Sequence, residues 1–193
     1  LRVFQISDLH LGAVLDRVRL EKVVELAREA RPDLVAITGD TLDARVGLDA
    51  YIPLLSSLNA PLGKFAVLGN HDFYSGSDTS VAFLTRAGFR VLRAERVEVA
   101  RAGSPFLVAG VDDPGGRHMG QECRTDEYAA LPPTRGLFTI LLKHQPRISR
   151  QSGERFDLQL SGHTHGGHVF PFHFIVRSIY RYFAGLYEVG AGQ

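Results

Sequence analysis

The stretch "FDLQLSGHTHGG", residues 156–167, joins an apolar segment to a loop that holds two histidines and three glycines. Residues 156–162 predict a β-strand. The glycines that follow would let the backbone turn tightly, so that His163 and His165 can approach a common point without side-chain bulk in the way. The stretch therefore predicts a strand that ends in a loop able to present imidazoles.

The same arrangement follows four other predicted strands, at 2–6, 34–38, 64–68 and 137–143. The polar side chains that come directly after these strands are Asp8 and His10, then Asp40, then Asn70, His71 and Asp72, and then His144. In an open α/β sheet the carboxyl ends of the strands share one edge, and ligands bind there. Five separate loops are therefore predicted to meet at one rim.

The rest of the pattern indicates the fold class. Amphipathic stretches at 16–30, 48–58 and 78–88 predict helices between the strands. Residues 90–111 show little helical period and predict adjacent antiparallel or mixed strands, and "TDEYAAL" predicts a short helix. Repeated strand–helix–strand units indicate an α/β fold with mixed, largely parallel β-sheets covered by helices. We expect one domain over residues 1–193.

Composition narrows the class of protein. The formal net charge of +1 gives no case for nucleic-acid binding. The single cysteine, Cys123, excludes an internal disulfide. No apolar run reaches the roughly 20 residues of a membrane span, and no signal peptide is recognisable. Because the chain begins at Leu1 within a strand-like run and stops after "EVGAGQ", we expect that both ends are cut and leave open an anchor or signal outside them.

The polar set has the chemistry of a metal site. Carboxylate oxygens, imidazole nitrogens and an amide oxygen suit divalent ions such as Mn, Fe or Zn, and no thiolate is among them. Two Asp, one Asn and four His exceed what one ion needs, whereas two ions about 3.5–4 Å apart would share a carboxylate. Asn70 and His71 are neighbours in the sequence, so one can bind an ion while the other faces a substrate.

Each of these residues also has a local structural explanation. Asp40 could cap a helix, Asn70 could occupy a left-handed turn, and His144 could be a buried, hydrogen-bonded histidine. A metal site is favoured because local roles would have to coincide at five strand ends. The sequence assigns no role to His118, His168 and His173. His168 could donate a hydrogen bond to a metal ligand, contact the substrate or do neither.

The motifs "DLH", "GD", "GNHD", a lone His after a strand, and "GHTHGG" occur in this order between Asp8 and Gly167. Together they resemble the calcineurin-like metallophosphoesterase superfamily. "GHTHGG" with "GLYE" (185–188) is further similar to a bacterial branch that includes membrane-associated phosphoesterases and enzymes that cleave UDP-2,3-diacylglucosamine. The resemblance implies a four-layer fold in which helices sandwich the two sheets.

The resemblance also implies a role for each residue. The first metal would be held by Asp8, His10 and His165. The second would be held by Asn70, His144 and His163, and Asp40 would bridge the two. His71 would contact the phosphate and protonate the leaving oxygen, with Asp72 as its orienting partner.

These roles imply a metal-dependent phosphoric ester hydrolase that uses two divalent ions. Its substrates would be phosphodiesters, phosphomonoesters or pyrophosphates, with a lipid-linked substrate preferred. The alternatives are a nucleotide or cyclic-nucleotide phosphodiesterase and a non-catalytic scaffold of the same fold, which missing metal ligands would have favoured. We expect a cytoplasmic or membrane-associated protein with peripheral membrane contact.

The segment 169–187 motivates the expected membrane contact. Phe170, Phe172 and Phe174 alternate, which would place them on one side of an extended chain. "IVRSIYRYF" (175–183) has helical spacing, with an apolar face formed by Ile175, Ile179 and Tyr182 and a cationic face formed by Arg177 and Arg181. Such a helix can lie on anionic lipid, and the alternative is that its apolar face packs against the sheet.

Overall fold

A computed structural model of the chain describes residues 1–12, 14, 16–44, 47–149, 152, 155–167 and 173–189. The strands are β1 (Val3–Ile6), β2 (Leu34–Ile37), β3 (Lys64–Ala66), β4 (Arg90–Val91), β5 (Glu95–Val99), β6 (Phe106–Gly110), β7 (Thr139–Leu142) and β8 (Leu158–Leu160). The α-helices are α1 (Arg17–Ala30), α2 (Ile52–Ser56), α3 (Asn70–Tyr74), α4 (Ser77–Arg86), α5 (Glu127–Ala130) and α6 (His173–Ile179). Short 3₁₀ segments are η1 (Leu48–Tyr51), η2 (Pro114–Met119) and η3 (His165–Gly167).

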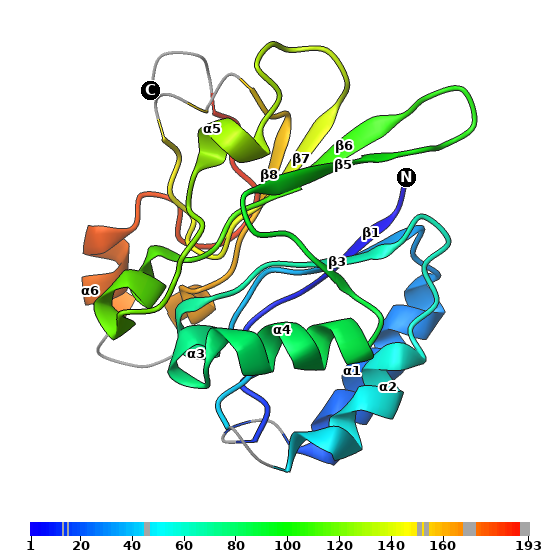
Figure 1. The fold of residues 1–193 in the computed structure, drawn as a ribbon, viewed down its shortest axis with the longest axis vertical. Helices are drawn as coiled ribbons and strands as arrows, with labels where there is room; N and C mark the ends of the chain where they lie inside the picture. Colours follow the sequence, from blue (N-terminus) through cyan, green and yellow to red (C-terminus); the bar gives the residue numbers. More distant parts are fainter. Residues whose placement is uncertain are drawn as a thin grey trace.

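The first sheet has the order β1-β2-β3-β4, and all its strands are parallel. One of its faces is covered by α1, α2 and α4, which lie on the same side in Figure 1. In α1 the covered residues are Leu20, Val24 and Ala27, which recur at helical spacing. The side chain of Asp16 accepts a hydrogen bond from the backbone N–H of Arg19, so the helix begins at a capped residue.

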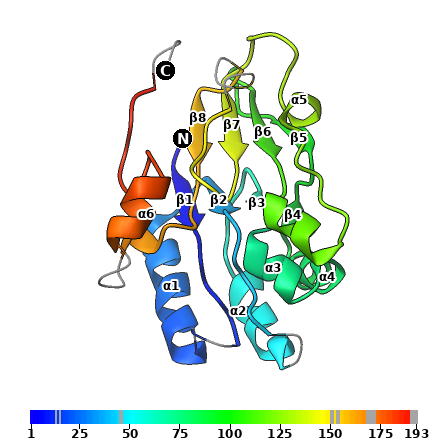
Figure 2. The same ribbon diagram turned by 90° about the vertical axis from the view of Figure 1, so that its left-hand side faces the viewer.

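The second sheet has the order β5-β6-β7-β8, with β5 antiparallel to β6 and the other pairs parallel. Its inner face packs on the first sheet, where Ala36 and Phe65 contact a cluster that includes Val108 and Ile140. On its outer face, Ala109 and Leu141 pack against Ala130 and Leu131 at the end of α5. Helices, sheet, sheet and helix thus form four layers, which Figures 1 and 2 show from two sides.

The architecture confirms the predicted mixed, largely parallel α/β fold, and individual elements differ from expectation. Residues 90–91 form β4, which pairs with β3 in the first sheet and is not adjacent to β5. Residues 70–74, expected to be a loop, form the five-residue helix α3. The helix predicted over 175–183 is instead α6, which begins at His173 and ends at Ile179. No helix in the described ranges is both long enough and apolar enough to cross a membrane.

Candidate metal centre

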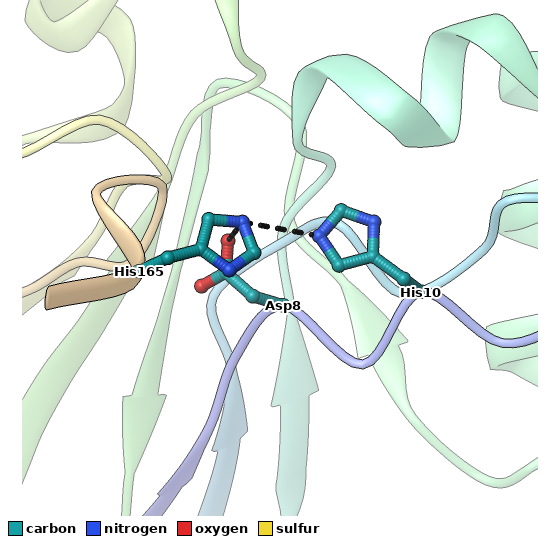
Figure 3. Close-up of side chains that lie close together, drawn as sticks. All are labelled: Asp8, His10 and His165. Carbon is teal, nitrogen blue, oxygen red and sulfur yellow. Dashed lines mark hydrogen bonds and ion pairs between the residues drawn. The ribbon is translucent and has the colours of Figure 1, made fainter. Parts of the chain in front are cut away.

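Three side chains that follow β1 and β8 form the first candidate group. Asp8, His10 and His165 each offer one ligand atom, and these atoms all lie within 4.8 Å of one another. The Nε2 of His165 is 3.4 Å from the Asp8 Oδ1 and 3.3 Å from the Nε2 of His10, as Figure 3 shows. The two imidazoles come from loops that are distant in the sequence and point toward one another.

Three more side chains, which follow β2, β7 and β8, form the second group. The Nε2 of His144 is 3.2 Å from the Asp40 Oδ2 and 3.1 Å from the Nδ1 of His163. The other ring nitrogen of His144, Nδ1, is 2.8 Å from the backbone oxygen of Thr38. A proton held on Nδ1 by this bond leaves the Nε2 lone pair directed at the group, which is how metal-binding histidines are usually oriented.

Asp40 connects the two groups. Its Oδ2 lies 3.2 Å from the His144 Nε2 and 3.9 Å from the His10 Nε2. Its Oδ1 accepts a 2.9 Å hydrogen bond from the backbone N–H of His71. The residue is 2% exposed, so its carboxylate is held inside the rim rather than in solvent.

Asn70 provides a further oxygen at the first residue of α3. Its Oδ1 is buried and has no hydrogen-bond partner in the described part of the chain. A buried acceptor without a donor is destabilising unless something else binds it. Together with pairs of imidazole nitrogens 3.1 and 3.3 Å apart, this oxygen makes the donor set fit divalent cations.

The backbone is left-handed at the same positions. Among described residues other than glycine, positive φ angles occur at Asp8 (56°), His10 (47°), Asp40 (52°), His163 (73°) and His165 (50°), and elsewhere only at Arg31 and Ala94. This conformation costs an L-residue roughly 1–2 kcal/mol. Such strain persists where the surrounding structure holds it, and it gathers at functional sites.

The predicted role of the glycines in giving these side chains room is confirmed at two positions. A Cβ at Gly162 would overlap the Ser7 hydroxyl and the Asp8 carboxylate, and a Cβ at Gly69 would overlap the Asp40 carboxylate. Neither glycine has a positive φ. Space, and not backbone freedom, therefore requires glycine at both positions.

His71 lies at the edge of the site, with its ring centroid 4.6 Å from that of His10. The predicted partnership between His71 and Asp72 is wrong, because the Nδ1 of His71 is hydrogen-bonded to Oδ1 of Asp43. The Oδ2 of Asp43 lies 2.9 Å from the Nδ1 of His10. Asp43 therefore orients both rings, and the sequence reasoning missed it, although its position three residues after Asp40 in "GDTLD" is a usable signal.

Asp72 points away from His71 and into the protein. Its carboxylate accepts hydrogen bonds from the backbone N–H groups of Thr41, Leu42 and Gly69. Burial, with a smaller contribution from the charge of Asp40, raises the pKa of Asp72 to about 7 against the effect of these bonds. The residue ties the loop after β2 to the start of α3 and so fixes the backbone on which Asp40 and His71 stand.

The charges of the second group are coupled. Burial tends to raise the pKa of Asp40, but the hydrogen bond and charge of His144 outweigh it and hold this pKa below its usual value. Burial tends to lower the pKa of His144, whereas the hydrogen bond and charge of Asp40 raise it to about 9. Burial and the charge of His144 lower the pKa of His163. Without a metal, the proton of this group therefore resides on His144.

Comparison with known proteins identifies the family of this chain. Residues 1–167 match the model of the calcineurin-like phosphoesterase family. The chain belongs to this family. Membership places it among the metal-dependent phosphoric ester hydrolases and implies divalent metal ions as cofactors, for which the carboxylate and imidazole groups described above are suitable.

Relatives of this phosphoesterase are found in bacteria and animals. An uncharacterized metallophosphoesterase of Aquifex aeolicus is 43% identical over all of this chain and 74% of its own length. One of Campylobacter jejuni is 32% identical over 98% of this chain and 50% of its own length. A Danio rerio protein named a transmembrane protein with metallophosphoesterase domain is 31% identical over 98% of this chain and 46% of its own length. The chain thus spans about half the length of the latter two relatives.

Solved structures share the fold. The NAD nucleotidase of Haemophilus influenzae has a TM-score of 0.60 at 18% identity, over 86% of this chain and 38% of that one. The calcineurin-like phosphoesterase YfkN of Bacillus subtilis has a TM-score of 0.59 at 19% identity, over 89% of this chain and 73% of that one. The predicted family and fold are thereby confirmed.

The remaining histidines lie elsewhere or outside the described residues. His118 is exposed on η2. His168 falls outside the described residues, and for His173 only the backbone, at the start of α6, is described. Cys123 donates from Sγ to the backbone oxygen of Asp113 and belongs to none of the candidate groups.

Proposed function

We propose that this phosphoesterase hydrolyses phosphodiester, phosphomonoester or pyrophosphate bonds with a pair of divalent ions. The first ion would be held by Asp8, His10 and His165, and the second by Asn70, His144 and His163. The position of Asp40 carries the proposal, because one carboxylate lies within 4 Å of a histidine from each group. A carboxylate in that place can bridge two ions.

Two bound ions would supply a water molecule activated as the nucleophile and positive charge that offsets the charge developing on the phosphoryl oxygens. The chain itself supplies the proton for the leaving oxygen. His71 stands beside the first group, and its Nδ1 is hydrogen-bonded to the Asp43 carboxylate, which orients the ring so that its other nitrogen can act as a proton donor at this edge of the site. Asp43 thus takes the orienting role that the sequence suggested for Asp72.

The donor chemistry supports Mn, Fe or Zn as the metals, because imidazole and carboxylate suit all three and thiolate is absent from the set. Metal analysis of the purified protein, combined with an activity screen on mono-, di- and pyrophosphate substrates, tests the proposal. We expect about two ions per chain and hydrolysis of at least one substrate class. Asp40→Ala should lose both ions and the activity.

A matched control separates loss of a ligand from loss of a charge. Asp49 carries an exposed carboxylate that pairs with Arg86, and Asp49→Ala should keep both the metal and the activity. Full metal occupancy in Asp40→Ala, or one ion per chain in the unaltered protein, would contradict the dinuclear proposal. Metal binding without hydrolysis of any class would instead support the non-catalytic scaffold.

A lipid-linked substrate and peripheral membrane contact remain part of the proposal because of the residues around and after α6. Ile179 is 56% exposed and Leu186 is 89% exposed, and the Arg177 and Arg181 side chains are exposed nearby. Tyr182 is half-buried, so the apolar face is only partly in solvent. Phe170 and Phe172 lie outside the described residues, as does the side chain of Phe174. The name of the Danio rerio relative shows that this domain occurs in a transmembrane protein.

The membrane part has its own test. The double variant Ile179→Ser, Leu186→Ser should lose activity on a lipid-linked phosphate ester while a soluble phosphodiester is hydrolysed as before. Both residues are exposed, so folding should be unaffected. Equal rates on the lipid-linked ester for variant and parent would remove the support for membrane contact.

A further inference from the structure

Tyr180, the residue directly after α6, lies beside the second candidate group. Its ring centroid lies 5.2 Å from that of His163, with the rings inclined at 66°. Its hydroxyl donates to the Oε1 of Gln145 at 3.3 Å. The Nε2 of Gln145 in turn donates to the Oδ2 of Asp113 at 2.8 Å. Because Gln145 directly follows His144, this chain of hydrogen bonds ties the ring that contacts His163 to the loop that carries His144.

A second contact holds the residues after α6 to the metal loop. The hydroxyl of Thr164, which lies between His163 and His165, donates to the backbone oxygen of Phe183 at 2.7 Å. The segment is therefore attached at two places, three residues apart, to the loop that carries two of the candidate ligands. Tyr180 and Phe183 therefore lie directly beside the loop that carries His163 and His165.

The guanidinium of Arg147 packs on the Tyr180 ring. Its carbon is 5.0 Å from the centroid of the Tyr180 ring. Arg93 and Arg124 are paired with Asp112 and Glu122, but Arg147 forms no ion pair with any carboxylate of the described residues. An arginine that is stacked on an aromatic ring and lacks a carboxylate partner can receive an external oxyanion, because its planar donors match phosphate and carboxylate oxygens.

We propose that Arg147 binds a second anionic group of the substrate, on the part that stays with the phosphorus when the leaving group departs. The inference rests on the proposed function. Arg147 and His163 contact the same Tyr180 ring, with the guanidinium carbon 5.0 Å and the His163 ring centroid 5.2 Å from its centroid, so the guanidinium is suitably placed for a group that neighbours the one held by the histidines.

The position of His71 indicates which part of the substrate, the leaving group or the retained part, faces Arg147. His71 contacts His10 of the first group, whereas Tyr180 contacts His163 of the second. If the leaving oxygen is protonated at His71, the retained part of the ester is free to extend toward Tyr180 and Arg147. The substrate class that follows is a phosphate ester whose retained part carries a second phosphate or a similar oxyanion. Tyr180 acts here as a positioning residue.

A matched pair of substrates tests the inference. The p-nitrophenyl ester of thymidine 5′-phosphate and the same ester with an added 3′-phosphate release the same leaving group and differ only in a second anion on the retained part. We expect the parent enzyme to prefer the 3′-phosphorylated ester about tenfold in kcat/KM, the size of one charge-assisted hydrogen bond. In Arg147→Gln this preference should fall to about one, with the metal content unchanged.

The control is Arg101→Gln, since Arg101 is an exposed arginine in the turn between β5 and β6. This variant removes the same charge and should keep the tenfold preference. Tyr180→Phe retains the ring that supports Arg147 and should lose less of the preference than Tyr180→Leu. A preference of one in the parent enzyme, or an unchanged preference in Arg147→Gln, would overturn the inference.

Calorimetric binding gives a readout that does not depend on turnover. Thymidine 3′,5′-bisphosphate should bind the metal-loaded protein more tightly than thymidine 5′-monophosphate, and Arg147→Gln should abolish the difference. Failure to hydrolyse any ester would count against the proposed function, whereas an equal affinity for the two nucleotides in the parent protein would count against the role of Arg147.

Discussion

Asp43 places one carboxylate between two imidazoles, those of His10 and His71, for which we propose different roles. One oxygen meets the Nδ1 of His71 and the other meets the Nδ1 of His10, so that the far nitrogen of each ring is turned toward the site. Such partners of metal-site histidines fix the tautomer and the ring angle. Replacement of Asp43 is therefore expected to affect both metal binding and proton transfer.

His71→Ala should keep the metals and lose activity by roughly 10²–10⁴-fold, the usual contribution of a general acid. The loss should be larger for an alkyl leaving group than for p-nitrophenolate, which leaves without a proton. Asp43→Asn should show the same dependence on the leaving group, together with weaker metal binding. Steady-state rates on the two esters at saturating metal check this. Equal losses on both esters would argue against proton transfer by His71.

The protonation of His144 makes metal binding depend on pH. Its pKa is raised to about 9 in the metal-free protein, so the ring is charged at neutral pH, whereas a metal needs the neutral ring. Metal affinity should therefore rise with pH up to about 9. Binding at pH 7 should release about one proton from this residue. Calorimetric titration in two buffers with different ionisation enthalpies measures the release. Affinity that is constant between pH 7 and 9 would contradict it.

At the level of elements, the loop after β8 packs closely on the loop after β1 because Gly162 has no side chain. Gly162→Ala should push the Asp8 carboxylate out of place, because the added Cβ would overlap it and the Ser7 hydroxyl. We expect loss of the ion assigned to Asp8, His10 and His165, measured as metal content per chain. Gly136→Ala is the matched control, since a Cβ there would meet nothing within 4 Å. An unchanged metal content in Gly162→Ala would contradict this prediction, because it would mean that the loop moves to make room for the added Cβ.

The elements also show where sequence reasoning succeeded and where it failed. The strand ends were predictable because each apolar run stops directly before a polar loop. Helix α3 was not, because "GNHD" is too short to show a period. The same error produced the pairing of His71 with Asp72. Consecutive residues of a helix point in different directions, so Asp72 faces the core while His71 faces the rim. The sequence offered Asp43 only as the last residue of "GDTLD", and its role as the partner of both rings became clear from contacts across the fold.

For the whole molecule, the candidate ligands come from both sheets. Asp8, Asp40 and Asn70 follow strands of the first sheet, whereas His144 and His163 follow strands of the second. Bound ions would join the two sheets at their common edge. Each ion that binds only the folded chain stabilises it by about 2.7 kcal/mol at a free concentration one hundred times the Kd, so two such ions stabilise it by about 5.4 kcal/mol.

For a chain of this size, the stabilisation by two ions corresponds to a rise in Tm of roughly 11–22 °C. Scanning calorimetry with Mn²⁺ and with EDTA measures the difference, and one cooperative transition is expected if residues 1–193 form a single domain as predicted. The Asp40→Ala variant should show no rise with metal. A rise of the same size in that variant would place the stabilising ions elsewhere.

The left-handed backbone at the candidate ligands has a consequence for the metal-free chain. His165 has a φ of 50° and a side chain that is 48% exposed. His165→Gly should therefore raise the free energy of unfolding in EDTA by about 1 kcal/mol, because glycine adopts this conformation without strain. Variants selected for heat resistance in the absence of metal would accumulate such substitutions and would lose hydrolytic activity, because the replaced residues are the candidate metal ligands. At these few positions, selection for stable folding thus favours glycine, whereas selection for hydrolysis favours the metal-binding residue.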